Sequence, residues 1–88
     1  MTRTSIVDFP ALIERLQGAI ALDPMFARAH SLIASMMYAT IAEGAIKEAS
    51  WESTLANADF HARRAHSLDP LLGEPLVTLG LLETLRGH

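Results

Sequence analysis

The tripeptide Leu-Asp-Pro occurs twice in this 88-residue chain, at positions 22–24 and 68–70. Each copy ends an alanine- and leucine-rich stretch, and the two copies are offset by 46 residues. Proline has no N–H with which to continue a helix, but it fits the first turn of the next one. Each copy therefore predicts a sharp corner between two helices, and the repetition predicts a stack of similar helical units.

Apolar residues recur at helical spacing in four segments of the chain. We expect helices over residues 8–22, 26–42, 51–68 and 73–86. Asp8 is suited to cap the first helix, Gly44 to end the second and Ser50 to cap the third. The predicted fold class is all-α, with antiparallel helix hairpins stacked side by side.

The domain organisation follows from length and composition. We expect a short N-terminal tail at 1–7 and a single helical domain at 8–87 that contains an elongated link at 43–50. Half of the residues are hydrophobic and only 19% are charged, against about 25% in an average soluble domain. This excess of apolar residues suggests that part of the surface faces another chain.

Charge and hydropathy bear on the classes of partner. A net charge of −3 with seven scattered Lys and Arg residues argues against nucleic acid, which usually requires a basic stripe. The longest stretch without charged residues, 29–42, has fourteen residues, fewer than the roughly 20 that span a membrane. The chain has no cysteine, which fits a reducing compartment. We expect a cytoplasmic protein whose partners are proteins or peptides.

Two surfaces are candidates for binding such a partner. A polar strip on the second helix is predicted to form a partner-binding groove, in which the arginine grips a carboxylate or phosphate and the tyrosine adds apolar area. The alternative is that this strip is an ordinary exposed helix face with no binding role. The last helix is apolar on nearly every side, so we expect it to self-associate. The strip comprises Arg28, Ser31, Ser35 and Tyr38, and the self-association face comprises Leu76, Leu81, Leu82 and Leu85.

The spacing around each Leu-Asp-Pro resembles the tetratricopeptide repeat, in which antiparallel helices A and B stack into a right-handed superhelix. The matching residues are Ala19, Leu22, Ala27, Ile33 and Ala34 in the first copy, and Ala58, Ala65, Leu68, Leu79 and Gly80 in the second. In the family, Leu-Gly places a small residue where helices A and B cross. The resemblance implies that the chain is a helix B, one full A–B repeat and a further helix A, with the concave groove lined by helix A.

The chain departs from the family pattern in two respects. Its offset of 46 residues exceeds the usual period of about 34, which places about twelve extra residues in the link. His30 and Leu76 stand where the family has a bulky aromatic residue, and Met37 replaces a tyrosine. The long link and the ending at 62–70 resemble the repeat regions that follow bacterial class III nucleotide-cyclase or winged-helix transcriptional-regulator domains. No residue matches the catalytic or DNA-reading parts of those proteins.

Catalytic and metal chemistry find little support in the sequence. The four histidines lack the spacing of a metal site, and His30 is expected to pack in the core. Ser31 and Ser35 have no nucleophile motif around them. We therefore expect no catalytic residue, metal or cofactor, and predict a protein–protein interaction or oligomerisation module of a bacterial signalling protein. A peptide receptor using the helix A groove is the alternative, and a small enzyme is the least supported reading.

Overall fold

Four α-helices make up the structure: α1 (Phe9–Leu22), α2 (Ala27–Ala42), α3 (Trp51–Leu68) and α4 (Glu74–Leu85). The computed structural model describes residues 9–44 and 47–87, and it contains no strand in those ranges. A short 3-10 turn, η1 (Glu48–Ser50), leads into α3. The all-α prediction is confirmed, and each helix begins and ends within one residue of its predicted bounds. Asp8, the predicted first cap, lies outside the described residues.

The two Leu-Asp-Pro corners contain the same hydrogen bonds. In the first, Asp23 Oδ1 accepts from the N–H of Met25 at 3.2 Å; in the second, Asp69 Oδ1 accepts from the N–H of Leu71 at 3.1 Å. The backbone carbonyls of the two aspartates each accept from the N–H three residues later, at 3.1 and 3.0 Å. This aspartate turn is a local alternative to the helical hydrogen bonds. The repeated sequence thus forms a repeated corner.

Two other helix ends show how local chemistry sets the boundaries. Gly44, with φ of 71°, follows α2, and Gly87, with φ of 86°, follows α4. Glycine adopts this left-handed conformation without steric cost, so the prediction for Gly44 is confirmed. The prediction that Ser50 caps α3 is wrong, because its side chain makes no cap hydrogen bond. Ser50 is instead the last residue of η1, and its αR backbone (φ −97°, ψ −1°) differs from that of a usual N-cap.

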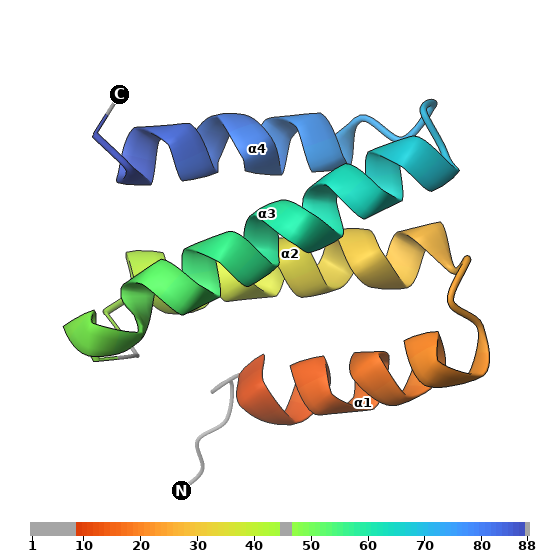
Figure 1. Cartoon of the computed structure of the whole chain (residues 1–88), viewed down its shortest axis with the longest axis horizontal. Helices are drawn as coiled ribbons and strands as arrows, with labels where there is room; N and C mark the ends of the chain where they lie inside the picture. Colours follow the sequence, from red (N-terminus) through yellow and green to blue (C-terminus); the bar gives the residue numbers. More distant parts are fainter. Residues whose placement is uncertain (1–8, 45–46, 88) are drawn as a thin grey trace, which may run out of the picture.

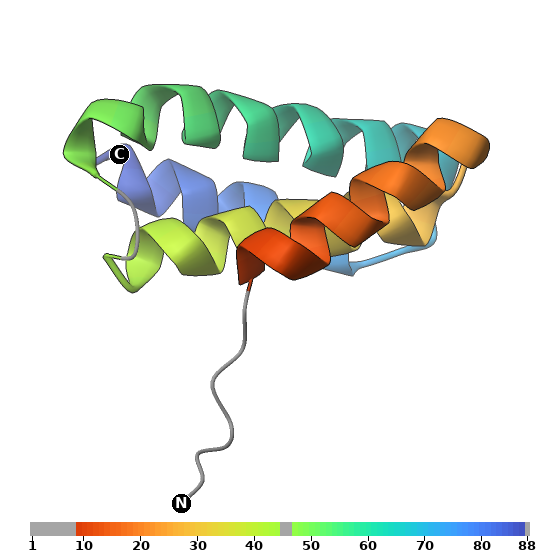
Figure 2. The same ribbon diagram turned by 90° about the horizontal axis from the view of Figure 1, so that it is seen from below.

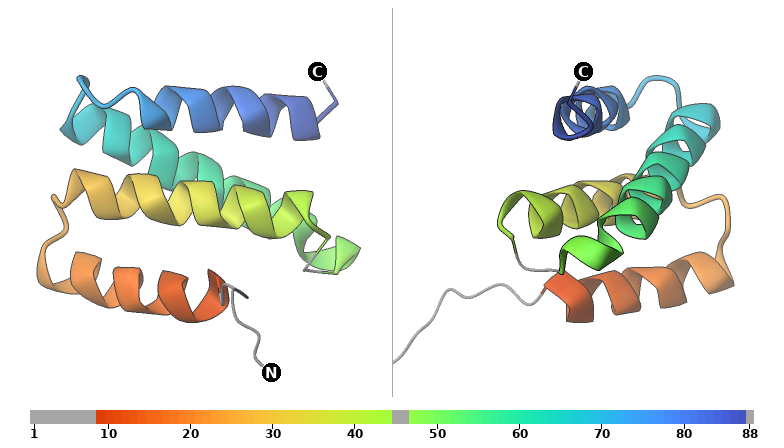
Figure 3. Two further views of the ribbon diagram at one scale, coloured as in Figure 1. Left: turned by 180° about the vertical axis from the view of Figure 1, so that it is seen from behind. Right: turned by 60° about the vertical axis from the view of Figure 1, so that its left-hand side comes forward.

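The helices form an open stack and not a closed bundle (Figure 1). The antiparallel hairpin of α2 and α3 lies at the centre, α1 packs against α2, and α4 packs against both hairpin helices. The start of α1 lies beside the second half of α2 (Figure 2). Among the described residues α1 and α4 make no contact, and they lie on opposite sides of the hairpin (Figure 3). Both end helices therefore have a face that no other described helix covers.

The core lies where α2, α3 and α4 meet. Three side chains of α2 are buried together with residues of the other two helices: the cluster consists of Ile33, Met37, Ile41, Leu55, Ala58 and Leu82. A stripe of small residues lies on the buried side of α3, where Ala58, Ala62 and Ala65 have no exposed surface. Small residues at this spacing let α2 and α3 approach closely.

No described helix is long and apolar enough to cross a membrane.

Candidate interaction surface

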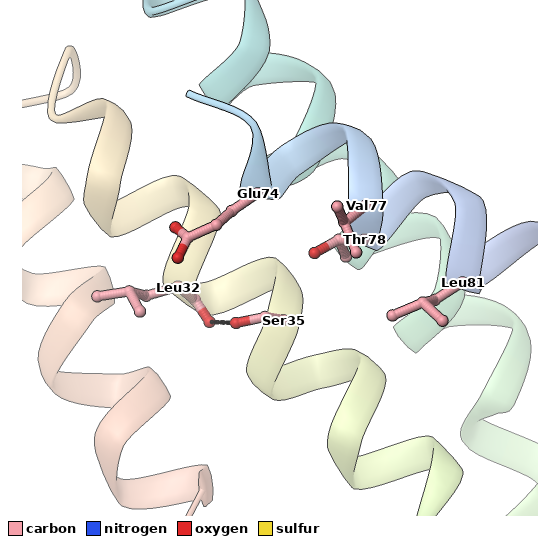
Figure 4. A pocket seen from close by; sticks show the side chains of 6 residues that line it. All are labelled: Leu32, Ser35, Glu74, Val77, Thr78 and Leu81. Atoms are coloured by element: carbon pink, nitrogen blue, oxygen red, sulfur yellow. Dashed lines mark hydrogen bonds between the residues drawn. The ribbon is translucent and has the colours of Figure 1, made fainter. Parts of the chain in front are cut away.

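A shallow apolar groove runs between α2 and α4, which point in the same direction in Figure 1. It has a volume of about 260 Å³. Figure 4 shows the side chains that line it, two from α2 and four from α4. They are Leu32, Ser35, Glu74, Val77, Thr78 and Leu81. Aliphatic side chains dominate the groove, and Glu74 supplies its only ionisable group among these residues.

Helical periodicity explains why these residues share the groove. Leu32 and Ser35 are three residues apart on α2, while Glu74, Val77 and Leu81 follow at intervals of three and four on α4. Such spacings place side chains on one face of a helix. Leu32 is 43% exposed and Val77 64% exposed. The Ser35 hydroxyl donates to the carbonyl of Leu32 at 3.0 Å, so the α2 wall presents more carbon than hydroxyl.

The predicted polar strip on α2 is wrong in part. Arg28 is exposed and Ser35 is half-buried in the groove, but Ser31 is only 2% exposed. Tyr38 is half-buried and packs against the core cluster. The reason is that α2 contacts α1, α3 and α4, which leaves only a narrow exposed stripe. The exposed stripe contains Arg28 and Leu32, and the half-buried Ser35 lies at its border.

The predicted self-association face on α4 also needs one correction. Leu76 and Leu81 are exposed, at 52% and 39%, as predicted. Leu82 is completely buried in the core, and Leu85 is half-buried against it. Val77 is the residue that the sequence analysis missed on the exposed side. Because apolar residues surround α4, the sequence could not indicate which of them face α2 and α3.

The two predicted surfaces meet in the structure. Ser35 came from the predicted strip on α2 and Leu81 from the predicted face of α4, and both line the same groove. The groove therefore has one wall from the predicted strip on α2 and one wall from the predicted face of α4. We define the outer face of α4 as the exposed residues Leu76, Val77, Gly80 and Leu81.

A second opening lies between α1 and the hairpin. Its volume is about 270 Å³, and it is lined by Pro10, Ile13, Met37, Thr40 and Thr54. The hydroxyl of Thr40 donates to the carbonyl of Met36 at 2.8 Å. No ionisable side chain lines this opening, so it offers an apolar contact surface and no group for acid–base chemistry.

A buried histidine contact links α2 to α3 away from the groove. His30 is 4% exposed, which confirms its predicted place in the core. Its Nδ1 lies 2.9 Å from Nδ1 of His61, and its Nε2 lies 3.0 Å from the carbonyl oxygen of Pro24. Burial of the His61 ring, followed by the charge of His30, lowers the pKa of His61 below 6.5.

The contact between His30 and His61 was not predicted from the sequence, although the positions of the two residues carry a signal for it. In an antiparallel hairpin, residues equally distant from the link lie opposite each other. His30 is 12 residues before the end of α2, and His61 is 10 residues after the start of α3. The spacing of histidines along one helix does not indicate a pair that forms across the hairpin.

The described residues contain no group of three or more side chains that could hold a metal ion. Comparison with protein-family models, curated protein sequences and solved structures gave no match for this chain. A functional interpretation must therefore come from its own surfaces.

Proposed function

We propose that this chain is a non-catalytic interaction module of the tetratricopeptide-repeat type that binds a second copy of itself. The observation that carries the proposal is the outer face of α4. Leu76, Val77 and Leu81 are all substantially exposed there, and Gly80 between them has no heavy atom within 4 Å of where a Cβ would lie. Contiguous exposed apolar residues usually mark an interaction site. A glycine at the centre permits close approach of another helix.

The opposite end of the stack favours a closed dimer over a fibre. The exposed residues in the middle of α1 include Glu14, Arg15 and Gln17, which are polar, while the exposed apolar Leu22 is its last residue. A stacked array needs polar outer faces on its terminal units to stop further growth. Pairing of α4 with α4 about a two-fold axis would cover the apolar end of each copy and leave the polar α1 ends in water.

Mutation of the outer face tests this proposal by changing the mass of the particle. We expect the wild-type chain to be a dimer by light scattering at high micromolar concentration. Val77→Glu should make it a monomer, because a paired interface would bury the new carboxylate without a partner. Leu71→Glu is the matched control: Leu71 is 94% exposed in the second corner and is not part of the outer face, so this variant should keep the wild-type mass. A monomeric wild type at that concentration would contradict the proposal.

The groove supports a second candidate, a receptor for peptides. Its aliphatic walls and its single acidic residue, Glu74, suit a peptide with aliphatic side chains and one basic residue. Leu32→Glu separates the two candidates, since Leu32 lies on α2 and outside the outer face of α4. Loss of peptide capture from a display library at unchanged particle mass would favour the receptor. Unchanged capture would reject it.

The proposal also includes the kind of protein in which this module works. The resemblance of the long link and the 62–70 segment to repeats of bacterial cyclases and transcriptional regulators supports a role in a cytoplasmic signalling or regulatory protein. In such a protein, the module would bring two copies of an attached domain together.

A further inference from the structure

His30 is hydrogen-bonded through both ring nitrogens although it is almost completely buried. A carbonyl oxygen only accepts, so the 3.0 Å contact with Pro24 requires that Nε2 of His30 carries the hydrogen. In the neutral ring, Nδ1 of His30 is then an acceptor. The 2.9 Å contact with His61 therefore requires that Nδ1–H of His61 donates to His30.

This arrangement limits the number of protons that the pair can hold. One added proton can bind Nε2 of His61, and the donation from His61 to His30 continues. A second would have to bind Nδ1 of His30, where two N–H groups would then face each other at the 2.9 Å now spanned by the hydrogen bond. No acceptor would remain between the rings, so they would have to separate.

The charged groups around the pair do not change the number of protons that it can hold. His30 is the titratable neighbour whose charged form acts on the His61 ring. The charged side chains that flank the pair in sequence, Asp23, Arg28 and Arg64, are exposed and therefore screened by water. The charged side chains of α1 and α4 are also exposed: Glu14, Arg15, Glu74 and Glu83. Asp59 on α3 forms ion pairs with Arg63 and Arg86, and Arg86 also pairs with Glu83.

We propose that the His30–His61 pair is a pH-sensitive lock. Its two hydrogen bonds hold the first corner and α2 against α3, and the bond between the rings breaks when the pair binds a second proton. Opening would release the carbonyl of Pro24, which lies between α1 and α2. Because α2 is the only described helix whose backbone comes close to that of α1, α1 is the element whose attachment would loosen first. This device is independent of the outer face of α4.

The direction of the pH effect follows from the number of protons that each state can hold: the unfolded chain can place one on each ring, whereas the folded pair holds only one. The lowered pKa of His61 acts in the same direction. As the pH falls below 6.5, the ordinary value, the unfolded chain binds a proton before the folded chain does. The folded state is then disfavoured. The contribution of the pair is complete above pH 6.5 and is lost as the pH falls through the interval below it.

Urea denaturation at about pH 7.5, 6.5 and 5.5 tests the lock. The folded-to-unfolded ratio of the wild type should fall several-fold more over this range than that of His61→Gln, which cannot titrate. His66→Gln is the control, because His66 is half-buried on the same helix outside the pair, and it should behave like the wild type. If His61→Gln does not fold, His30→Gln replaces it, since its amide can still donate to Pro24.

Nitrogen NMR of the histidine rings gives a second readout on the wild-type chain. At about pH 8 we expect hydrogen on Nδ1 of His61 and on Nε2 of His30. Below pH 6.5, amide signals of the first corner should shift together with the second protonation of the pair. The lock is overturned if wild type and the non-titrating variant show the same pH dependence. It is also overturned if both rings become charged while the corner signals stay unchanged.

Discussion

Three alanines on α3, Ala58, Ala62 and Ala65, have no exposed surface and lie on one face of the helix. Each is too small to fill space between separated helices, so their burial means that the neighbouring backbone comes close. Protein interiors are packed as tightly as organic crystals, and added volume at such positions is not easily accommodated. At the scale of single residues, the small size of these side chains permits the close packing that stabilises the hairpin.

Enlarging one of these alanines should therefore destabilise the fold. We expect Ala62→Leu to lower the free energy of unfolding by about 1–3 kcal/mol, because extra methylene groups in a full core force side chains and backbone apart. Urea denaturation measures the change. Ala56→Leu makes the same substitution at an exposed position of α3 and should change stability by less than about 0.5 kcal/mol. Equal effects at both positions would show that the α2–α3 contact is not close.

At the scale of elements, the corners depend on their aspartates. Each one accepts a hydrogen bond from a backbone N–H two residues later through its side chain. That N–H lies in the corner between two helices and belongs to neither of them. The proline fixes the backbone between them and prevents the helix from continuing. The corner is thus set by residues adjacent in sequence.

Removing one acceptor should weaken the second corner. We expect Asp69→Ala to lower the free energy of unfolding by about 1 kcal/mol, the usual net value of one such hydrogen bond. Asp69→Asn should retain most of the stability, since its amide carbonyl can accept the same N–H. Thermal unfolding of both variants distinguishes the hydrogen bond from the negative charge. If the asparagine variant is as unstable as the alanine variant, the charge is what matters.

At the scale of the whole molecule, stability is unevenly distributed along the stack. The hairpin of α2 and α3 holds five of the six residues of the core cluster, while α1 has no fully buried side chain among those described. Its apolar residues Ile13, Leu16 and Ile20 are only half-buried against the core. A helix attached on one side only should open at lower free energy than the centre of the stack.

Hydrogen exchange should reveal this gradient. We expect the amides of α2 and α3 to exchange most slowly and those of α1 most rapidly among the four helices. Mass spectrometry of the exchanging chain resolves the helices separately. Self-association through α4 should additionally slow exchange in α4 as the protein concentration rises, with little change in α1. Exchange in α1 as slow as that in α3 would contradict the open arrangement.

Local chemistry was sufficient to predict the helices and their ends. The Leu-Asp-Pro corners and Gly44 act on their own backbone, and hydrophobic spacing alone indicated the four helical segments. The same reasoning placed His30 in the core. It was wrong where a residue could face either a neighbouring helix or water. Ser31 and Leu82 are both buried because of where α1, α3 and α4 lie relative to α2 and to each other.

The sequence by itself determined where the backbone turns, because proline, glycine and an aspartate side chain constrain their immediate neighbours and nothing further. Only the tertiary structure decided which faces remain open and which distant residues meet. The pairing of His30 with His61 and the joining of Ser35 with Leu81 in one groove depend on how far each helix is rotated about its axis. That rotation is set by the packing of all the helices together, and no single helix encodes it.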